Sequence, residues 1–138
     1  MSLDVEYSRP VPHPDQLSAR WYEATQRHEL PLQRCTKCGA YMAPIKPRCV
    51  VCFAPAPEWV EACGQGTLYT FTVVHQPYPG FADRIPYNIA VVELDEGVRV
   101  TADVVDCPND ALQIGMALEV VFDDISDQVT LPRFRPVA

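Results

Sequence analysis

The chain has 138 residues, of which 48% are hydrophobic, and a formal net charge of −7. This length allows one domain or a small module followed by a small domain, and no apolar run approaches the roughly 20 residues that a membrane span needs. The surplus negative charge lies in residues 67–138, which hold four basic and eleven acidic side chains, so this half is poorly suited to binding nucleic-acid phosphates.

A single helix is expected near the N-terminus. Residues 1–14 contain prolines and lack the apolar segment of a signal peptide, so we expect an extended arm and a cytoplasmic protein. The helix is predicted to run from Asp15, as its N-cap, to His28. Its apolar face follows helical spacing and consists of Leu17, Trp21, Ala24 and His28.

Two Cys-x-x-Cys pairs follow the helix, Cys35 with Cys38 and Cys49 with Cys52, and ten residues separate the pairs. This spacing folds two knuckles toward one centre and predicts a closed, structural zinc site with four sulfur ligands. A zinc held by four thiolates has no open position for water, so it does not catalyse hydrolysis. Iron is the closest alternative, because residues 35–41 resemble a rubredoxin knuckle.

The remaining cysteines, Cys63 and Cys107, stand alone on expected strands or at their ends. This arrangement favours the reduced thiols of a cytosolic protein over a disulfide framework. A redox dithiol needs one Cys-x-x-Cys in a βαβ context, which this pattern does not fit. We therefore expect Cys63 and Cys107 to be small core side chains and not nucleophiles.

The second half of the chain is predicted to form a small β-barrel. Five runs are rich in β-branched and aromatic residues: Thr67–His75, Tyr87–Leu94, Val98–Val105, Leu118–Asp123 and Val129–Phe134. Before them, Glu58–Cys63 leads through Gly64-Gln65-Gly66, where a bulge or sharp bend is expected. Five short strands with no long helix among them indicate a closed barrel of the OB type, with a β-sandwich as the alternative.

Alternation along two of these strands predicts which side chains enter the core. In the first strand, Tyr69, Phe71 and Val73 are expected to share one face and to alternate like core residues. The turn Asp95-Glu96-Gly97 predicts a hairpin between the second and third strands. The third strand then alternates Val98, Val100, Ala102 and Val104 with Arg99, Thr101 and Asp103.

The proline-rich loop 76–86 joins the first two strands and carries large apolar side chains. Prolines keep it out of the sheet, and loops that join strands of an OB barrel are where ligands bind. Two interpretations remain open, a binding surface for a ligand or partner, or a cap that folds over one barrel end. The candidate binding side chains are His75, Tyr78, Phe81, Arg84 and Tyr87.

No catalytic residue is predicted. The three histidines do not fit a Ser-His-Asp or Cys-His arrangement. The carboxylates crowd into turns such as Asp95-Glu96 and Asp123-Asp124, which is typical of a solvated rim and not of an acid–base pair.

In the order of its parts, the chain resembles the acyl-CoA-associated family of zinc-ribbon and OB-fold proteins, which long carried a domain-of-unknown-function label. The resemblance covers nearly the whole chain and predicts three parts, an arm and helix over 1–30, a zinc ribbon over 31–57 and an OB-fold barrel over 58–138. In the second cysteine pair, Val50 and Phe53 stand where zinc knuckles often have proline and glycine, but the ligands are intact. The segments that carry the resemblance are 21–24, 32–39, 47–52, 64–75, 86–98 and 114–116.

This resemblance implies a non-catalytic accessory subunit that pairs with a thiolase-like or lipid-transfer-type enzyme and helps form its acyl-CoA site. Such pairs serve the degradation of lipids, sterols or aromatic acids. Two alternatives remain, a single-stranded nucleic-acid-binding protein and an independent enzyme acting on CoA thioesters. The acidic barrel half argues against the first.

Four basic side chains surround the knuckles and have two interpretations in this light. They form either a cradle for the phosphates of coenzyme A or compensation for a zinc site that is dianionic with four thiolates. Charge compensation is the favoured interpretation, and the phosphate cradle stays open. The four residues are Arg34, Lys37, Lys46 and Arg48.

Overall fold

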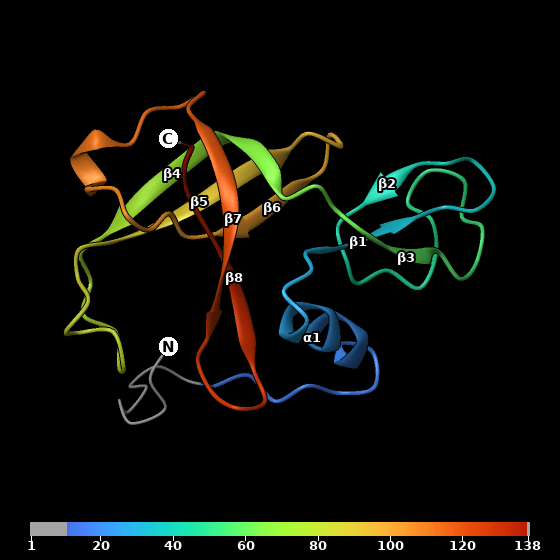
Figure 1. The fold of residues 1–138 in the computed structure, drawn as a ribbon, viewed down its shortest axis with the longest axis horizontal. Helices are drawn as coiled ribbons and strands as arrows, with labels where there is room; N and C mark the ends of the chain where they lie inside the picture. Colours follow the sequence, from blue (N-terminus) through green and yellow to red (C-terminus); the bar gives the residue numbers. More distant parts are fainter. Residues whose placement is uncertain (1–10, 138) are drawn as a thin grey trace.

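The computed structural model describes residues 11–137, which form one α-helix, eight strands and a short 3-10 helix (Figure 1). The strands make two sheets, one in the order β2-β1-β3 and one in the order β6-β5-β4-β7-β8. In chain order the elements are α1 (Ala19–Gln26), β1 (Pro31–Arg34), β2 (Tyr41–Met42), β3 (Glu58–Glu61), β4 (Gln65–Val74), β5 (Tyr87–Leu94), β6 (Arg99–Ala102), η1 (Asn109–Ala111), β7 (Ala117–Asp124) and β8 (Thr130–Pro136).

Helix α1 begins later than the sequence predicts, because its N-cap is Ser18 and not Asp15. The Asp15 carboxylate instead closes the preceding turn, accepting hydrogen bonds from the Ser18 N–H at 2.8 Å and the Ser18 hydroxyl at 2.9 Å. Leu17 therefore precedes the helix and is 70% exposed, contrary to the prediction, whereas Ala24 is buried as predicted. Among residues 11–137, no helix is long and apolar enough to cross a membrane.

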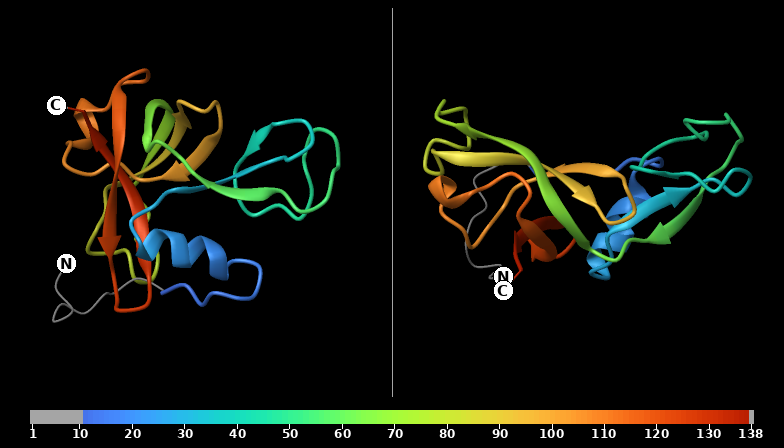
Figure 2. Two further views of the ribbon diagram at one scale, coloured as in Figure 1. Left: turned by 45° about the vertical axis from the view of Figure 1, so that its right-hand side comes forward. Right: turned by 90° about the horizontal axis from the view of Figure 1, so that it is seen from above.

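The three-stranded sheet forms the base of the cysteine ribbon and lies beside the larger sheet (Figure 2). Strand β3 pairs antiparallel with β1, with Leu32 opposite Val60, before the chain enters the larger sheet. Leu32 is fully buried and belongs to the same core cluster as the barrel residues. Helix α1 contacts both β1 and β8, so it joins the two sheets.

All five strands predicted for the second half are present, as β4 to β8. Strand β4 is the longest and pairs with β5 along most of its length and with β7 at its start. At that start, a side chain on Gly66 would collide with the backbone carbonyl of Glu93, so only glycine fits there. The predicted hairpin between β5 and β6 is confirmed, with Gly97 in the left-handed region at φ 90°.

Strand β4 contains a β-bulge at Tyr69, where the pairing with β5 shifts between Leu68 and Thr70. The extra residue reverses which side chains face the core, so Leu68 is buried before the bulge and Phe71 packs on the core after it. Tyr69 is 45% exposed, and the Arg99 guanidinium lies 3.7 Å from its ring centre. The prediction that Tyr69 shares the core face with Phe71 is therefore wrong.

The five-stranded sheet curls until its two edges meet. Val104 forms a parallel bridge with Phe134 of β8. The Phe134 N–H donates to the Asp103 carbonyl at 3.0 Å, and the Val105 N–H donates to the Phe134 carbonyl at 2.7 Å. The largest fully buried side chains of this barrel are Leu68, Val92, Leu94, Leu118 and Phe134. A short helix, a four-cysteine ribbon and a curled five-stranded sheet confirm the predicted OB-type architecture.

Candidate functional site

The two Cys-x-x-Cys segments form matching turns. In the first, the Gly39 N–H donates to the Cys35 carbonyl at 3.0 Å, with Gly39 at φ 79°. In the second, the Phe53 N–H donates to the Cys49 carbonyl at 3.1 Å, with Phe53 at φ 63°. The same backbone geometry thus presents both cysteines of each pair from one side of its turn.

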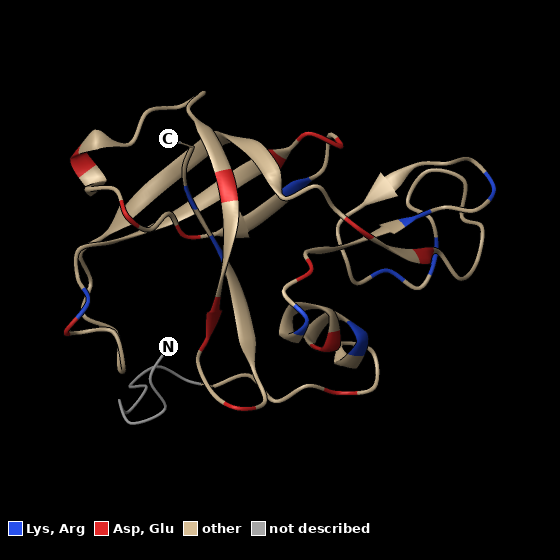
Figure 3. Ribbon diagram, in the orientation of Figure 1, with Lys and Arg blue, Asp and Glu red and all other residues tan. Residues whose placement is uncertain are grey.

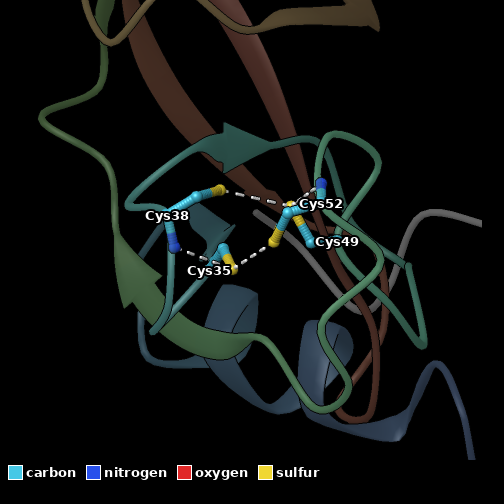
Figure 4. Close-up of side chains that lie close together, drawn as sticks. All are labelled: Cys35, Cys38, Cys49 and Cys52. Carbon is cyan, nitrogen blue, oxygen red and sulfur yellow. Dashed lines mark hydrogen bonds between the residues drawn. The ribbon is translucent and has the colours of Figure 1, made fainter.

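The four cysteine side chains point toward one another, as a close-up shows (Figure 4). The Sγ atoms of Cys35 and Cys52 lie 3.6 Å apart, as do those of Cys38 and Cys49, and all four lie within 4.8 Å of one another. A tetrahedral zinc with Zn–S bonds of about 2.3 Å separates its sulfurs by about 3.8 Å, whereas a disulfide joins sulfurs at about 2.05 Å. The cluster therefore has the dimensions of a metal site, and the four donors fit zinc or iron.

Backbone N–H groups point at two of these sulfurs. The Cys35 Sγ accepts hydrogen bonds from Lys37 and Cys38 at 3.3 and 3.4 Å, and the Cys49 Sγ accepts the equivalent bonds in its own turn at the same distances. The Cys38 N–H lowers the pKa of the Cys35 thiol to about 6, and the Cys52 N–H lowers the pKa of Cys49. Because thiolate is the form that binds metal, the turn N–H groups favour the binding-competent state of Cys35 and Cys49. For Cys38 the Ala40 N–H lowers the pKa, but desolvation and the neighbouring thiols outweigh it and raise the pKa to about 11.

Arginine precedes the first cysteine in both knuckles and closes each turn. The Arg34 Nε donates to the Gly39 carbonyl at 3.5 Å, and the Arg48 Nη1 donates to the Phe53 carbonyl at 3.0 Å. These contacts give the two arginines a part in shaping the turns. Their further roles, together with Lys37 and Lys46, in charge compensation or in phosphate binding stay predictions.

Gln33 is a supporting residue that the sequence reading missed. Its side chain is buried on β1, and its amide exchanges two hydrogen bonds with the Lys46 backbone, at 2.7 and 3.1 Å. This clamp fixes the segment that enters the second knuckle against β1. The short strand Pro31–Arg34 gives no sequence signal of this clamp, because the backbone that Gln33 bonds lies thirteen residues away at Lys46.

The loop 76–86 is partly folded back and partly exposed. Phe81 is half-buried, and its ring stacks on Tyr87 with the centres 5.3 Å apart. Tyr78 is 54% exposed, and His75 and Arg84 are also exposed. Both interpretations of the loop, and the binding roles of its side chains, stay predictions.

A groove lies between this loop, the end of β6 and the start of β8. It has a volume of about 730 Å³, and its lining includes Trp21, Phe81, Arg84, Tyr87 and Arg133. Of the predicted loop residues, Phe81, Arg84 and Tyr87 thus come together at one groove, whereas Tyr78 and His75 are not among its lining residues. No local pattern identified Arg133 or Trp21 as lining residues, because they are far apart in the sequence.

Arg133 is buried and held by two carboxylates. Its Nη1 donates to the Asp103 carboxylate at 2.9 and 3.0 Å, and its Nε donates to Asp123 at 2.9 Å. Burial acts to lower the pKa of Arg133, but Asp103 and then Asp123 outweigh it and raise the pKa above its ordinary value. The second terminal nitrogen, Nη2, is buried with no hydrogen-bond partner among the described residues.

The two lone cysteines differ from each other. Cys107 is half-buried and packs against the barrel core, in agreement with the prediction. Cys63 is exposed, contrary to the prediction, because it lies where the chain leaves β3 for β4. Its N–H donates to the Glu96 carboxylate at 2.8 Å, which ties this crossing to the β5–β6 turn.

Two protein-family models match consecutive parts of the chain. Residues 23–58 match the rubredoxin-like zinc ribbon domain of ChsH2, and residues 59–123 match the C-terminal OB-fold domain of ChsH2. A DUF35 domain-containing scaffold protein of Methanothermobacter thermautotrophicus is 34% identical over 109 residues, which cover 78% of this chain and 82% of that protein. The chain belongs to the DUF35 family.

Two further similarities place this DUF35 chain beside proteins with named activities. A protein of Thermomonospora curvata named "probable enoyl-CoA hydratase alpha subunit" is 36% identical over 129 residues, which cover 93% of this chain. The chain spans only 40% of the length of that relative. The solved structure of an Ltp2-ChsH2(DUF35) aldolase matches with a TM-score of 0.84 at 35% identity, covering 93% of this chain and 100% of that chain.

Proposed function

We propose that this protein is a non-catalytic accessory subunit that docks on a thiolase-like or lipid-transfer-type enzyme and helps form its acyl-CoA site. The observation that carries the proposal is the similarity to the Ltp2-ChsH2(DUF35) aldolase structure, which extends over the full length of the matched chain. A relative whose name refers to an enoyl-CoA hydratase subunit supports an acyl-CoA substrate class. Degradation of lipids, sterols or aromatic acids is the expected setting.

The cysteine cluster supports a structural role for the ribbon. Cys35, Cys38, Cys49 and Cys52 would hold a zinc ion, which supplies a cross-link between the two knuckles and no open coordination position. Zinc is favoured over iron because the site combines four thiolates with no requirement for redox chemistry in this role. The partner enzyme then supplies the reacting groups.

The charge distribution weighs against the nucleic-acid alternative. Basic side chains gather on α1 and around the knuckles, while acidic side chains predominate over the barrel half (Figure 3). An OB barrel that tracks a phosphate backbone needs a positively charged groove, which this barrel lacks. Binding a protein partner does not require a positively charged groove.

The proposal is tested by purifying the protein with its partner from the organism that encodes it and assaying both fractions. We expect a stoichiometric complex with a thiolase-like or lipid-transfer-type enzyme, and turnover of acyl-CoA by the complex but not by this chain alone. Thioester turnover by the isolated chain would support the independent-enzyme alternative. Salt-sensitive binding to a single-stranded oligonucleotide would support the nucleic-acid alternative.

A further inference from the structure

Strand β6 lies at one edge of the five-stranded sheet. Its backbone N–H and C=O groups point alternately toward β5 and away from it. The Leu94 N–H donates to the Val98 carbonyl at 2.8 Å, and Val100 and Ala102 follow Val98 at the positions opposite Val92 and Ala90. Hydrogen-bonded pairs alternate along an antiparallel ladder, so the backbone groups of Arg99 and Thr101 point away from β5. The Asp103 carbonyl and the Val105 N–H, which point the same way, bond to Phe134.

Pro132 stops the backbone pairing that joins the β6 edge to the β8 edge at Phe134. The next rung of a parallel ladder would need an N–H at residue 132 to reach the Thr101 carbonyl, and Pro132 has none. The two edges therefore separate beside Thr101, and β5 is the strand that pairs with β6 along its named length in the described part of the chain. Thr101 is left with a donor and an acceptor that face the opening.

Two hollows meet at this opening. One, of about 430 Å³, lies between α1 and the barrel, and the other is the groove of about 730 Å³ described above. Both are lined by Trp21, Thr101, Ala102 and Pro132. Arg133 lines the larger hollow, is 8% exposed, and has the partnerless Nη2 donor.

We propose that an extended segment of the partner enzyme docks in this opening and adds alongside the free edge of β6 at Thr101, with one of its carbonyl groups accepting a hydrogen bond from Arg133. The proposal rests on the proposed function, because it names where the acyl-CoA enzyme contacts this subunit. It explains why closure stops at Pro132 and why a buried guanidinium keeps one unused donor.

The chemistry of the opening suits a polypeptide. An edge strand offers alternating N–H and C=O groups, which an extended peptide backbone complements, while hollows beside it accept alternate side chains. The charged side chains that line the larger hollow are balanced, with Arg84 and Arg133 against Asp83 and Asp103. A phosphate-bearing ligand needs a surplus of positive charge, which this lining does not provide.

The test uses the full chain and the acyl-CoA enzyme that purifies with it. Thr101→Pro removes the outward N–H and spares the bonds to β5, and Thr101→Val keeps the backbone and is the matched control. We expect Thr101→Pro to weaken binding of the enzyme roughly tenfold and Thr101→Val to change it less than about twofold. Hydrogen exchange at residues 99–103 should slow in the complex.

Arg133→Lys provides a second test of the docking site that does not depend on the backbone edge of β6. It keeps a positive charge beside Asp103 but lacks the forked second nitrogen, so weaker binding with unchanged metal content supports the proposal. A complex that forms with unchanged affinity in Thr101→Pro and shows no protection at 99–103 overturns this docking site and leaves the accessory role standing. Absence of any complex overturns both. Slow exchange of the Arg99 and Thr101 N–H groups, which face away from β5, in the free chain would mean that the chain's own residues occupy the edge, which also overturns the proposal.

Discussion

At the scale of single residues, the metal site depends on backbone shape more than on the residues between the cysteines. The position after each Cys-x-x-Cys pair is left-handed, at φ 79° for Gly39 and 63° for Phe53. Glycine takes this conformation freely, whereas an L side chain there costs roughly 1–2 kcal/mol. Phe53 is 71% exposed, so its ring recovers little of that cost by packing.

A pair of substitutions separates turn geometry from side-chain contacts. We expect Phe53→Gly to keep the metal and to leave the free energy of unfolding unchanged or higher by up to about 1 kcal/mol, since relief of strain is partly offset by unfolded-state entropy. Gly39→Val should lower it by about 1–2 kcal/mol. Denaturant unfolding at a fixed zinc concentration measures both. Loss of metal from Phe53→Gly would show that the Phe53 ring itself supports the second knuckle.

At the scale of helices and strands, sequence periodicity predicted what is local and missed what depends on distant pairing. The β5–β6 hairpin follows from a short turn and a clean alternation, and Val98 and Val104 are buried as predicted. The bulge at Tyr69 arises because β4 carries one residue more than the segment of β5 opposite it. No pattern within β4 reports that mismatch.

The candidate site likewise has one part that the sequence predicts and one part that depends on distant residues. The cysteine cluster could be predicted because its ligands come from two short turns whose spacing is characteristic. The unpaired β6 edge could not, because it depends on Pro132 of β8 meeting β6 some thirty residues away in the chain. Arg133 reads in the sequence as a surface cation, and only the neighbouring Asp103 and Asp123 reveal that it is buried.

The C-terminal end of α1 is tied to the end of β7 by a polar contact that depends on pH. The Asp124 carboxylate receives a hydrogen bond from Thr130, and His28 Nε2 lies 3.1 Å from it. These contacts, Thr130 first, lower the pKa of Asp124 below its ordinary value of 3.8. A carboxyl with a lowered folded-state pKa stabilises the fold above its unfolded value and loses that contribution as the pH falls through the folded value.

We therefore expect Asp124→Asn to be less stable than the parent at pH 6, with the difference shrinking as the pH falls below 3.8 and through the lowered folded-state pKa of Asp124. Urea unfolding of both proteins across this range measures the difference. Release of metal in acid affects both proteins, so it cancels in the comparison. A difference that stays constant with pH would mean that the Asp124 charge contributes nothing to the contact.

The two core clusters predict how the ribbon and the barrel respond to loss of metal. Cys35, Met42 and Cys49 form a small cluster of their own, separate from the main core that runs from Leu30 to Phe134. The ribbon thus has few apolar contacts to replace a lost metal cross-link. The barrel core includes none of the four clustered cysteines.

Cys38→Ser should therefore release the metal and unfold the knuckles while β4 to β8 stay folded. Elemental analysis reports the metal, and amide spectra report the two parts separately. Cys63→Ser is the matched control, because Cys63 lies outside the cluster and should retain full metal content. Global unfolding of Cys38→Ser would show that the barrel needs the ribbon for its own stability.

At the scale of the whole molecule, the ribbon, α1 and the barrel surround the hollows that meet at Thr101, and the loop 76–86 borders the larger one. This arrangement places the most exposed aromatic side chain of that loop, Tyr78, next to a groove and outside it. An exposed aromatic beside a groove is typical of a side chain that a partner covers, because burying its ring removes apolar area from water.

Tyr78→Ala tests whether the loop belongs to the interface. Because Tyr78 is 54% exposed, its loss should change the free energy of unfolding by less than about 0.5 kcal/mol. If the partner enzyme covers the ring, its affinity should fall roughly tenfold, which corresponds to about 1.4 kcal/mol. Ile114→Ala is the matched control, since Ile114 is 68% exposed and lines neither hollow. Titration of each variant with the enzyme measures affinity, and equal affinity for the two would place the loop outside the interface.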